Sequence, residues 1–266
     1  MSRLAGFFAL TYLVTWTLWL ASTSAGALRA PLIYLGVFTP GIVALWLTAR
    51  REGREGVAVL GRRLVTWRVP IRWYAFALGY LLAMKLTAAL VFRMLTGDWP
   101  RFGGGVEYVL LEVVASLALF WVQAGEEVGW RGYALPRLTS RIGLRGASIV
   151  LGVIWATWHL PLFFMTATTT TGQSFPLYLA QVTALSVAIA WLHAHTSGSL
   201  LLVMIMHAAI NNTRNVVPSA VAFGETPFLL GGSLVGWITA ALLWLGGAYF
   251  LARMPNGRTE PHGAAT

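Results

Sequence analysis

The sequence contains no cysteine and few charged residues, and each of these absences excludes a class of protein. Without cysteine the chain has no disulfide, no thiolate metal ligand and no cysteine nucleophile. Only 11% of its residues are charged, against about 25% in soluble domains. Hydrophobic residues make up 57% of the 266 residues, and the mean hydropathy is +0.68. A soluble fold of this length could not bury so much apolar surface, so we predict an integral membrane protein.

Acidic residues are scarce: the chain has 9 Asp and Glu against 19 Lys and Arg, which gives a formal net charge of +10. A basic excess can indicate nucleic-acid binding, but that function needs Lys and Arg clustered on a soluble face. Here most basic residues lie between apolar runs, which is typical of membrane topology. We therefore expect membrane lipid and no nucleic acid among the partners.

Long apolar runs dominate the chain, and a transmembrane helix needs about 20 such residues. Eight runs qualify, at 4–23, 31–49, 73–96, 106–126, 147–167, 176–194, 199–217 and 228–251. The first run has a longer apolar core than the ~7–15 residues of a signal peptide, so we interpret it as a span. These runs predict an all-α, polytopic membrane protein of about eight transmembrane helices, with a central polar cavity open to the cytoplasmic side. No polar stretch is long enough for a second domain, so we expect one transmembrane domain at 1–252 and a polar, disordered cytoplasmic tail at 253–266.

The distribution of arginine predicts the orientation, because basic residues near span ends favour the cytoplasmic side. The predicted cytoplasmic loop after the second run carries Arg50, Arg51, Arg54, Arg62, Arg63, Arg68 and Arg72. Alternation of the spans adds Arg3, Arg137, Arg141, Arg145, Arg253 and Arg258 to the same side. The opposite side receives Arg29, Arg101 and Arg214. We expect a protein of the plasma membrane with both termini cytoplasmic.

The first polar motif runs from Gly125 to Arg131 and places Glu126 and Glu127 at the inner end of the run 106–126. A charged group at the centre of a span costs about 2.5–3.5 kcal/mol, so it needs a reason. Arg131 follows Glu127 by four residues, close enough for an ion pair on a helix. Glu126 is then the carboxylate without a local partner, which suits a general base. The alternative is an interfacial charge cluster that marks the end of a span.

The second motif, from Trp155 to Pro161, lies within the run 147–167. Trp155 and His159 are four residues apart, so they share one face of a helix. Because Pro161 has no backbone N–H, we expect a kink that frees the carbonyl of Thr157. A buried histidine can equally be a structural hydrogen-bonding group, and the motif alone leaves both interpretations open.

The third motif places His207 and Asn211 on one face of the run 199–217. Both side chains carry N–H groups, which suit stabilisation of a developing oxyanion. The alternative is polar packing between helices, which is common in membranes.

Other polar groups in the apolar runs receive structural interpretations. Lys85 and Arg93 have plausible partners in Glu107 and Glu112, as paired charges that fix the register of neighbouring helices. The remaining candidates for metal binding are His193 and His195, which we interpret as solvated histidines near a span end.

Three spans that each hold a polar group in apolar surroundings are expected to converge on one cavity. A carboxylate beside a histidine can activate water, and a histidine with an asparagine can hold an oxyanion. At this point the sequence resembles the CPBP intramembrane proteases, also called Abi proteins, which include the Ras-converting CAAX endopeptidases. That family's pattern is Glu-Glu-x-x-x-Arg, Phe-x-x-x-His and His-x-x-x-Asn. The corresponding residues here are Glu126-Glu127…Arg131, Trp155…His159 and His207…Asn211.

The resemblance implies a function and a role for each matching residue. The chain would be an intramembrane endopeptidase in which Glu126 is the general base and acts with His159 on a water molecule. His207 and Asn211 would form the oxyanion site. The substrate would be a peptide or protein, either prenylated or, in a bacterium, a pheromone, a bacteriocin precursor or a membrane-protein tail.

The resemblance also implies supporting roles, and it includes one departure. Glu127 would pair with Arg131 and hold the end of the helix. Trp155 stands where the family usually has Phe, so we expect an altered cavity wall and unchanged chemistry.

Two questions remain open at the level of sequence. Two histidines and a glutamate could form a catalytic zinc site. However, His-Glu-x-x-His is absent and an asparagine beside the second histidine suits an oxyanion better, so we favour a glutamate-dependent hydrolase without a cofactor. The alternative function is a non-catalytic membrane scaffold or bacteriocin self-immunity protein. A transporter should show repeats or broken helices in its two halves, and none is evident.

Overall fold

The computed structural model describes residues 3–166, 168, 170, 173–213, 216–217 and 227–255, and this part of the chain contains helices and no strands. The long helices are α1 (Arg3–Ser22), α2 (Arg29–Leu64), α3 (Ile71–Thr96), α4 (Val106–Leu119), α6 (Leu135–Trp158), α7 (Phe175–His195), α8 (Leu200–Thr213) and α9 (Leu234–Arg253). Short segments join them: η1 (Gly26–Leu28), η2 (Phe120–Gln123), α5 (Ala124–Glu127), η3 (Val128–Ala134) and η4 (Leu160–Phe163). Most of the predicted tail at 253–266 lies outside the described residues.

Six helical segments of the described chain are long and apolar enough to cross a membrane. One of them, Val106–Trp158, contains two of the predicted spans, and the apolar helix Leu200–Thr213 is shorter. The prediction of an all-α polytopic membrane protein is therefore confirmed. The number of crossings and the central cavity stay predictions.

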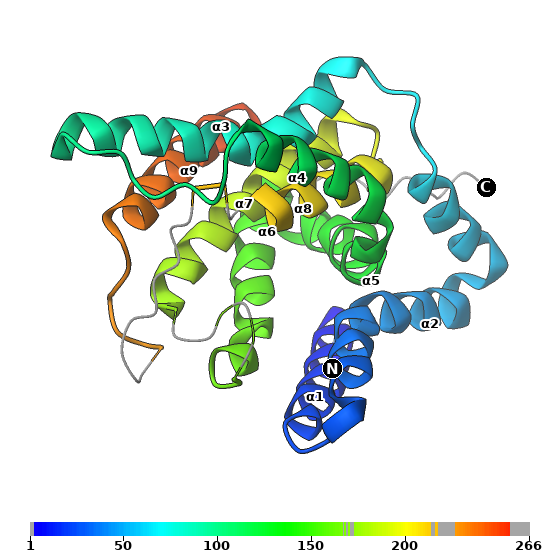
Figure 1. Cartoon of the computed structure of the whole chain (residues 1–266). Coiled ribbons are helices and arrows are strands. Elements are labelled where there is room, and N and C mark those ends of the chain that lie inside the picture. The colour runs from blue at the N-terminus through cyan, green and yellow to red at the C-terminus, as the bar shows by residue number, and fades with distance from the viewer. Residues whose placement is uncertain are drawn as a thin grey trace.

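Helix α8 lies at the centre of the molecule (Figure 1), where it contacts α3, α4, α7 and the short segments that follow α4. Most residues of α8 are buried, and its polar side chains lie towards its C-terminal end. A helix that is apolar on all sides is typical of the interior of a bundle. With 14 residues it rises about 21 Å, less than the ~30 Å of a hydrocarbon core.

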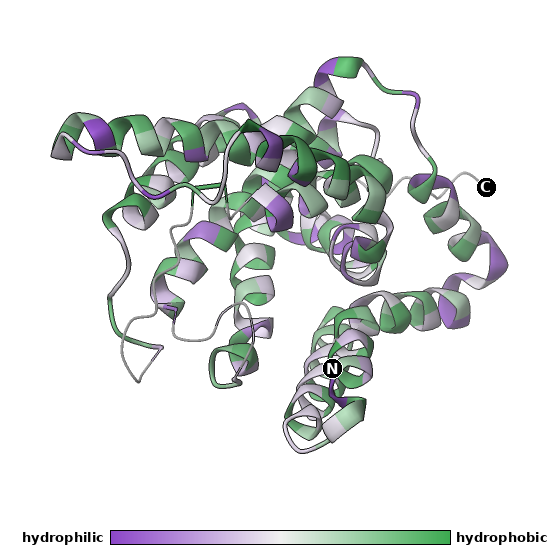
Figure 2. Cartoon of the chain, in the orientation of Figure 1, coloured by the Kyte–Doolittle hydropathy of each residue, from purple (hydrophilic) through white to green (hydrophobic). Residues whose placement is uncertain are grey.

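Contacts between distant segments group the arginines as the predicted topology does. Arg145 Nε and Nη2 donate to the carbonyl of Met254 at 3.0 and 2.8 Å, which joins the start of α6 to the end of α9. Arg137 forms an ion pair with Glu52 in α2. The segments predicted to share the basic side are therefore neighbours in space, and the hydrophilic stretch in the middle of α2 is visible in Figure 2.

The predicted loop after the second run is wrong, because helix α2 continues through it to Leu64. The helix changes direction at Gly53, whose φ of +63° is in the left-handed region that glycine adopts without strain. After this interruption the stretch to Leu64 contains no proline, so a second helical part can form there.

The predicted span 147–167 is wrong at its C-terminal end, whereas its predicted start lies close to Gly143, where a non-helical residue divides α6 into two helical parts. Helix α6 begins at Leu135 and ends at Trp158, and His159 caps it. The predicted free carbonyl of Thr157 is also wrong, because it accepts the backbone N–H of His159. Pro161 ends the helix instead of kinking it, because the helical conformation is disfavoured for a residue that precedes a proline.

A close crossing of α2 with the α5–η3 segment fixes the position of the glutamate motif. A Cβ on Gly41 would lie 2.8 Å from the backbone oxygen of Gly125, and a Cβ on Gly129 would lie 2.6 Å from the backbone carbon of Pro40. These distances are too short for any side chain atom, so the two backbones approach as closely as only glycine permits.

Replacing Gly41 by alanine is expected to lower the free energy of unfolding by about 1–3 kcal/mol, because the added carbon meets a backbone oxygen that cannot rotate away. Thermal unfolding of the purified protein measures the effect. Gly79→Ala in α3 is the matched control, because a Cβ there meets no atom within 4 Å. Equal melting temperatures for the two variants would show that the crossing is looser than the structure indicates.

Candidate active site

The glutamate motif lies where the chain changes helix type. Residues 120–123 form a 3-10 turn, residues 124–127 an α-helical turn, and residues 128–134 a π-helix. Single-turn π-helices are rare and occur frequently at functional sites. Every residue from Gly125 to Ala134 is buried, so the two glutamates lie inside the bundle rather than at its surface. The sequence analysis did not predict this change of helix type.

Glu127 is the centre of a buried charge network. Arg131 Nη1 donates to Glu127 Oε1 at 2.8 Å and to Oε2 at 3.1 Å, which is the ion pair that the i,i+4 spacing predicts. His207 Nδ1 lies 2.7 Å from Glu127 Oε1. Because an ionised carboxylate only accepts, Nδ1 carries the hydrogen and donates it. The network thus joins the first motif to the third across helices α5 and α8.

Glu126 has a partner that the sequence analysis missed. The indole Nε1 of Trp155 donates to Glu126 Oε2 at 2.7 Å. Glu126 has no bonded partner within its own helix, as expected, and its donor comes from α6. Substitution of tryptophan for the family's usual phenylalanine was the one signal that could have suggested it, since only tryptophan adds an N–H to the ring.

The tautomer of His159 follows from its contact with the backbone. Its Nδ1 lies 2.9 Å from the carbonyl oxygen of Trp155. A carbonyl can only accept, so Nδ1 carries the hydrogen, and the neutral ring presents its lone pair at Nε2. This nitrogen is the one that can accept a proton from water.

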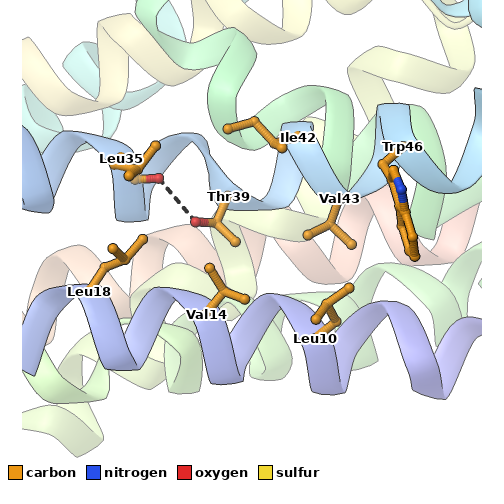
Figure 3. A pocket seen from close by; sticks show the side chains of 8 residues that line it. All are labelled: Leu10, Val14, Leu18, Leu35, Thr39, Ile42, Val43 and Trp46. Carbon is orange, nitrogen blue, oxygen red and sulfur yellow. Dashed lines mark hydrogen bonds between the residues drawn. The ribbon is translucent and has the colours of Figure 1, made fainter.

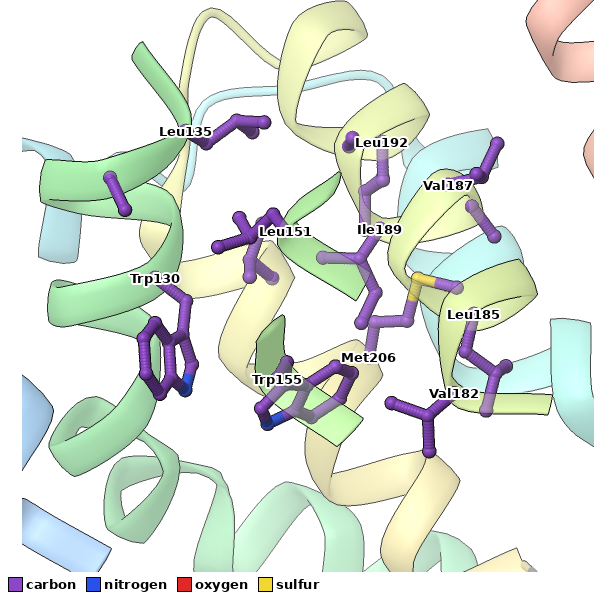
Figure 4. Packing of buried hydrophobic residues seen from close by; sticks show 14 of the residues in the cluster. Trp130, Leu135, Leu151, Trp155, Val182, Leu185, Val187, Ile189, Leu192 and Met206 are labelled. Atoms are coloured by element: carbon purple, nitrogen blue, oxygen red, sulfur yellow. The ribbon is translucent and has the colours of Figure 1, made fainter. Parts of the chain in front are cut away.

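Trp155 is the residue that brings the three motifs together. Its ring lies edge to face with the ring of His207 at a centroid distance of 5.1 Å, and the guanidinium of Arg131 lies 4.5 Å from its centroid. With the contacts to Glu126 and His159, it touches members of all three motifs. Figure 4 shows Trp155 within the buried apolar cluster. Trp155 therefore joins this cluster to the charged groups of the site.

Asn211 is less closely tied to this group than predicted. It lies on α8 one turn beyond His207, but its side chain is exposed, and its amide donates to Gln123 at 3.4 Å. A bond of that length is weak. Gln123 was not among the predicted site residues, and its place three residues before Glu126 gives no sequence signal of its own.

The other polar groups of the spans lie apart from this site. Lys85 Nζ donates to the carbonyl of Val217 at 3.1 Å, and Glu107 accepts the backbone N–H of Gly105 at the start of α4. His193 and His195 occupy the last turn of α7; His195 is exposed, but Nε2 of His193 is buried, so the solvated interpretation is wrong for His193.

Whether the site could hold a metal ion depends on how many ligands its side chains provide and how close together they lie. A catalytic zinc site uses three protein ligands within about 2.0–2.2 Å of the metal. Within the described ranges, no three His, Asp or Glu side chains are grouped closely enough to hold a metal ion. One ring nitrogen of His207 is also bound to Glu127. The described residues therefore do not fit the ligand set of a catalytic metal ion.

The sequence was compared with known proteins. The sequence model of the family described as Type II CAAX prenyl endopeptidase Rce1-like matches residues 108–213, which contain all three motifs. The predicted resemblance to CAAX endopeptidases is confirmed. A protein named CAAX prenyl protease 2, from Methanococcus maripaludis, is 27% identical over 221 residues, which cover 77% of this chain and 81% of that protein. The Rce1-like relationship supports endopeptidase activity in a membrane protein.

Proposed function

We propose that the chain is an intramembrane endopeptidase that hydrolyses a peptide bond with a water molecule activated by Glu126 and His159. The observation that supports this proposal is that Trp155 of the second motif contacts Glu126 and His207 of the other two, while its backbone carbonyl accepts the ring N–H of His159. An interfacial charge cluster, the structural alternative, needs no such convergence and would lie exposed. Burying these ionisable groups costs free energy, so their burial favours a functional role.

Glu126 and His159 would divide the work on water. The Oε2 atom of Glu126 accepts the indole N–H of Trp155, which orients the carboxylate and leaves Oε1 to accept a proton from water. The Nε2 lone pair of His159 is a second acceptor for the same molecule, and in its protonated form it can return the proton to the leaving amine. Positioned proton transfer of this kind contributes about 100- to 10,000-fold to a rate.

His207 and Asn211 would stabilise the tetrahedral intermediate. Since Nδ1 of His207 already donates to Glu127, only the protonated ring offers a second N–H at Nε2. Arg131 holds the carboxylate of Glu127 in place, and that carboxylate in turn orients the ring of His207. The exposed amide of Asn211 would supply the other donor as substrate binds.

The substrate would be a peptide attached to the membrane, and the similarity to CAAX prenyl protease 2 of Methanococcus maripaludis favours a prenylated one. A protein of the plasma membrane with cytoplasmic termini would meet such substrates at the basic side of the bundle, near Arg137 and Arg145. The second candidate function is peptide binding without cleavage, as a scaffold or immunity protein.

Cleavage of a panel of fluorogenic peptides, with and without a prenyl group, tests the proposal. Wild type and His159→Ala would be purified in detergent and assayed with and without a chelator. We expect cleavage by wild type, unchanged by chelation, and loss of about 100-fold or more in the variant. Inhibition by the chelator, reversed by zinc, would contradict the cofactor-free mechanism and keep the protease. Tight binding without cleavage of any peptide would favour the binding function.

Replacing Trp155 by phenylalanine is expected to lower kcat/KM about tenfold, because Glu126 loses a hydrogen bond to a charged acceptor. The matched control is Trp158→Phe, since Trp158 is equally buried and its indole N–H has no partner among the described residues. Steady-state kinetics of both variants gives the comparison. Equal losses in both would mean that ring size, and not the hydrogen bond, is what matters.

A further inference from the structure

A groove lies between α1 and α2, on the side of the hairpin away from the active site (Figure 3). Its volume is about 540 Å³, within the ~300–1,000 Å³ usual for small-molecule sites. Eight side chains line it: Leu10, Val14, Leu18, Leu35, Thr39, Ile42, Val43 and Trp46. The groove is therefore large enough for a ligand and belongs to none of the three motifs.

The lining of the groove suits a hydrocarbon chain. Its one aliphatic hydroxyl, on Thr39, is already bonded to the carbonyl of Leu35 at 3.0 Å. A peptide would need hydrogen-bond partners that these side chains do not offer, whereas an acyl chain needs none. Leu35, Ile42 and Trp46 are each about half exposed, so the groove is open to the surrounding bilayer.

The length of the groove matches one leaflet. From Leu35 to Trp46 helix α2 rises about 16 Å, roughly half of the ~30 Å hydrocarbon core. A transmembrane segment of another protein would need the full thickness. A single lipid chain, entering from one side of the membrane, needs only half.

The positive charge at the end of the groove indicates which class of lipid headgroup would bind there. The guanidinium of Arg50 lies 4.8 Å from the centroid of the Trp46 ring, and Arg50, Arg51 and Arg54 are exposed on the following turns of α2. Tryptophan and arginine at this depth are typical of the level of lipid headgroups. A phosphate placed over Trp46 would meet this positive charge.

We propose that this groove binds one anionic glycerophospholipid of the leaflet on the basic side, with an acyl chain between α1 and α2 and its phosphate at Arg50. The lipid would stabilise the active-site segment through α2. Thr39 and Val43 line the groove, while the neighbouring Gly41 contacts Gly125, next to Glu126. A lipid in the groove would thus contact the same turn of α2 that packs against Gly125, on the other face of the helix.

Native mass spectrometry of the delipidated full-length protein tests the proposal, with phosphatidylglycerol and phosphatidylcholine of identical chains as probes. We expect phosphatidylglycerol to bind about fivefold more tightly and to raise the melting temperature more than phosphatidylcholine does. Val14→Trp should fill the groove and weaken both lipids by at least tenfold. Arg50→Gln should weaken phosphatidylglycerol more than phosphatidylcholine, whose choline already offsets the phosphate charge, and so remove the preference between the two.

Two controls separate this site from general membrane effects. Leu13→Trp adds the same ring on an exposed face of α1 outside the groove, and Arg68→Gln removes an exposed charge that stacks on Trp67. Neither should change lipid binding. Loss of binding in the controls as in the test variants, or displacement of the phospholipid by a farnesylated peptide, would overturn the proposal. Because the readout is lipid binding, the result does not depend on the protease proposal.

Discussion

Replacing Glu126 by glutamine is expected to lower kcat/KM by about 100- to 10,000-fold, the range in which general base catalysis contributes. Glutamine has the same shape, and its amide oxygen can still accept the indole N–H of Trp155. It cannot take a proton from water. The fold should therefore persist while the chemical step fails, with kcat falling and KM nearly unchanged.

The matched control for this prediction is Glu107→Gln. Glu107 is exposed at the start of α4, and its carboxylate accepts the N–H of Gly105, which glutamine can also do. Activity should stay within about twofold of wild type. Substantial cleavage by the Glu126 variant, with its melting temperature unchanged, would remove Glu126 from the mechanism.

Replacing Arg131 by methionine is expected to lower the free energy of unfolding by about 3–5 kcal/mol, the cost of leaving one member of a buried ion pair without its partner. The side chains of Glu127 and Arg131 are both 0% exposed, so water cannot solvate the carboxylate that loses its partner. The carboxylate also anchors His207, so activity should fall together with stability. Denaturant unfolding in detergent measures the change.

The double variant Glu127→Gln with Arg131→Met separates the ion pair from packing. Removing both charges leaves neither one uncompensated, so much of the lost stability should return. Within the described part of the chain, Nε and Nη2 of Arg131 have no hydrogen-bond partner, which makes the wild-type pair costly to bury. Arg141→Met, at an exposed site, is the control and should change stability little. A double variant less stable than Arg131→Met alone would contradict this account.

The composition and apolar runs were sufficient to predict the fold class, because the bilayer requires long apolar helices and that requirement is local in sequence. Helix ends were predicted less well. The extension of α2 past Arg51 is polar, and hydropathy detects the membrane rather than the helix. The end of α6 at Trp158 depends on how Pro161 and the following turn pack, which hydropathy does not report either.

The site was predictable to the extent that its contacts lie within one helix. The pair of Glu127 and Arg131 follows from i,i+4 spacing alone. By contrast, the contacts of Trp155 with Glu126 and of His207 with Glu127 join different helices, and no spacing rule specifies such contacts. The close approach at Gly41 is likewise visible only once α2 and α5 are placed together.

A double-mutant cycle of Glu126→Gln and His159→Ala tests most directly whether these residues form one water-activating site. Residues that act as a unit in catalysis are strongly non-additive. The account predicts that the double variant has a kcat/KM within about threefold of the worse single variant. Losses that multiply, so that the double variant falls by the product of the two single effects, would show that Glu126 and His159 act separately and would contradict the shared site.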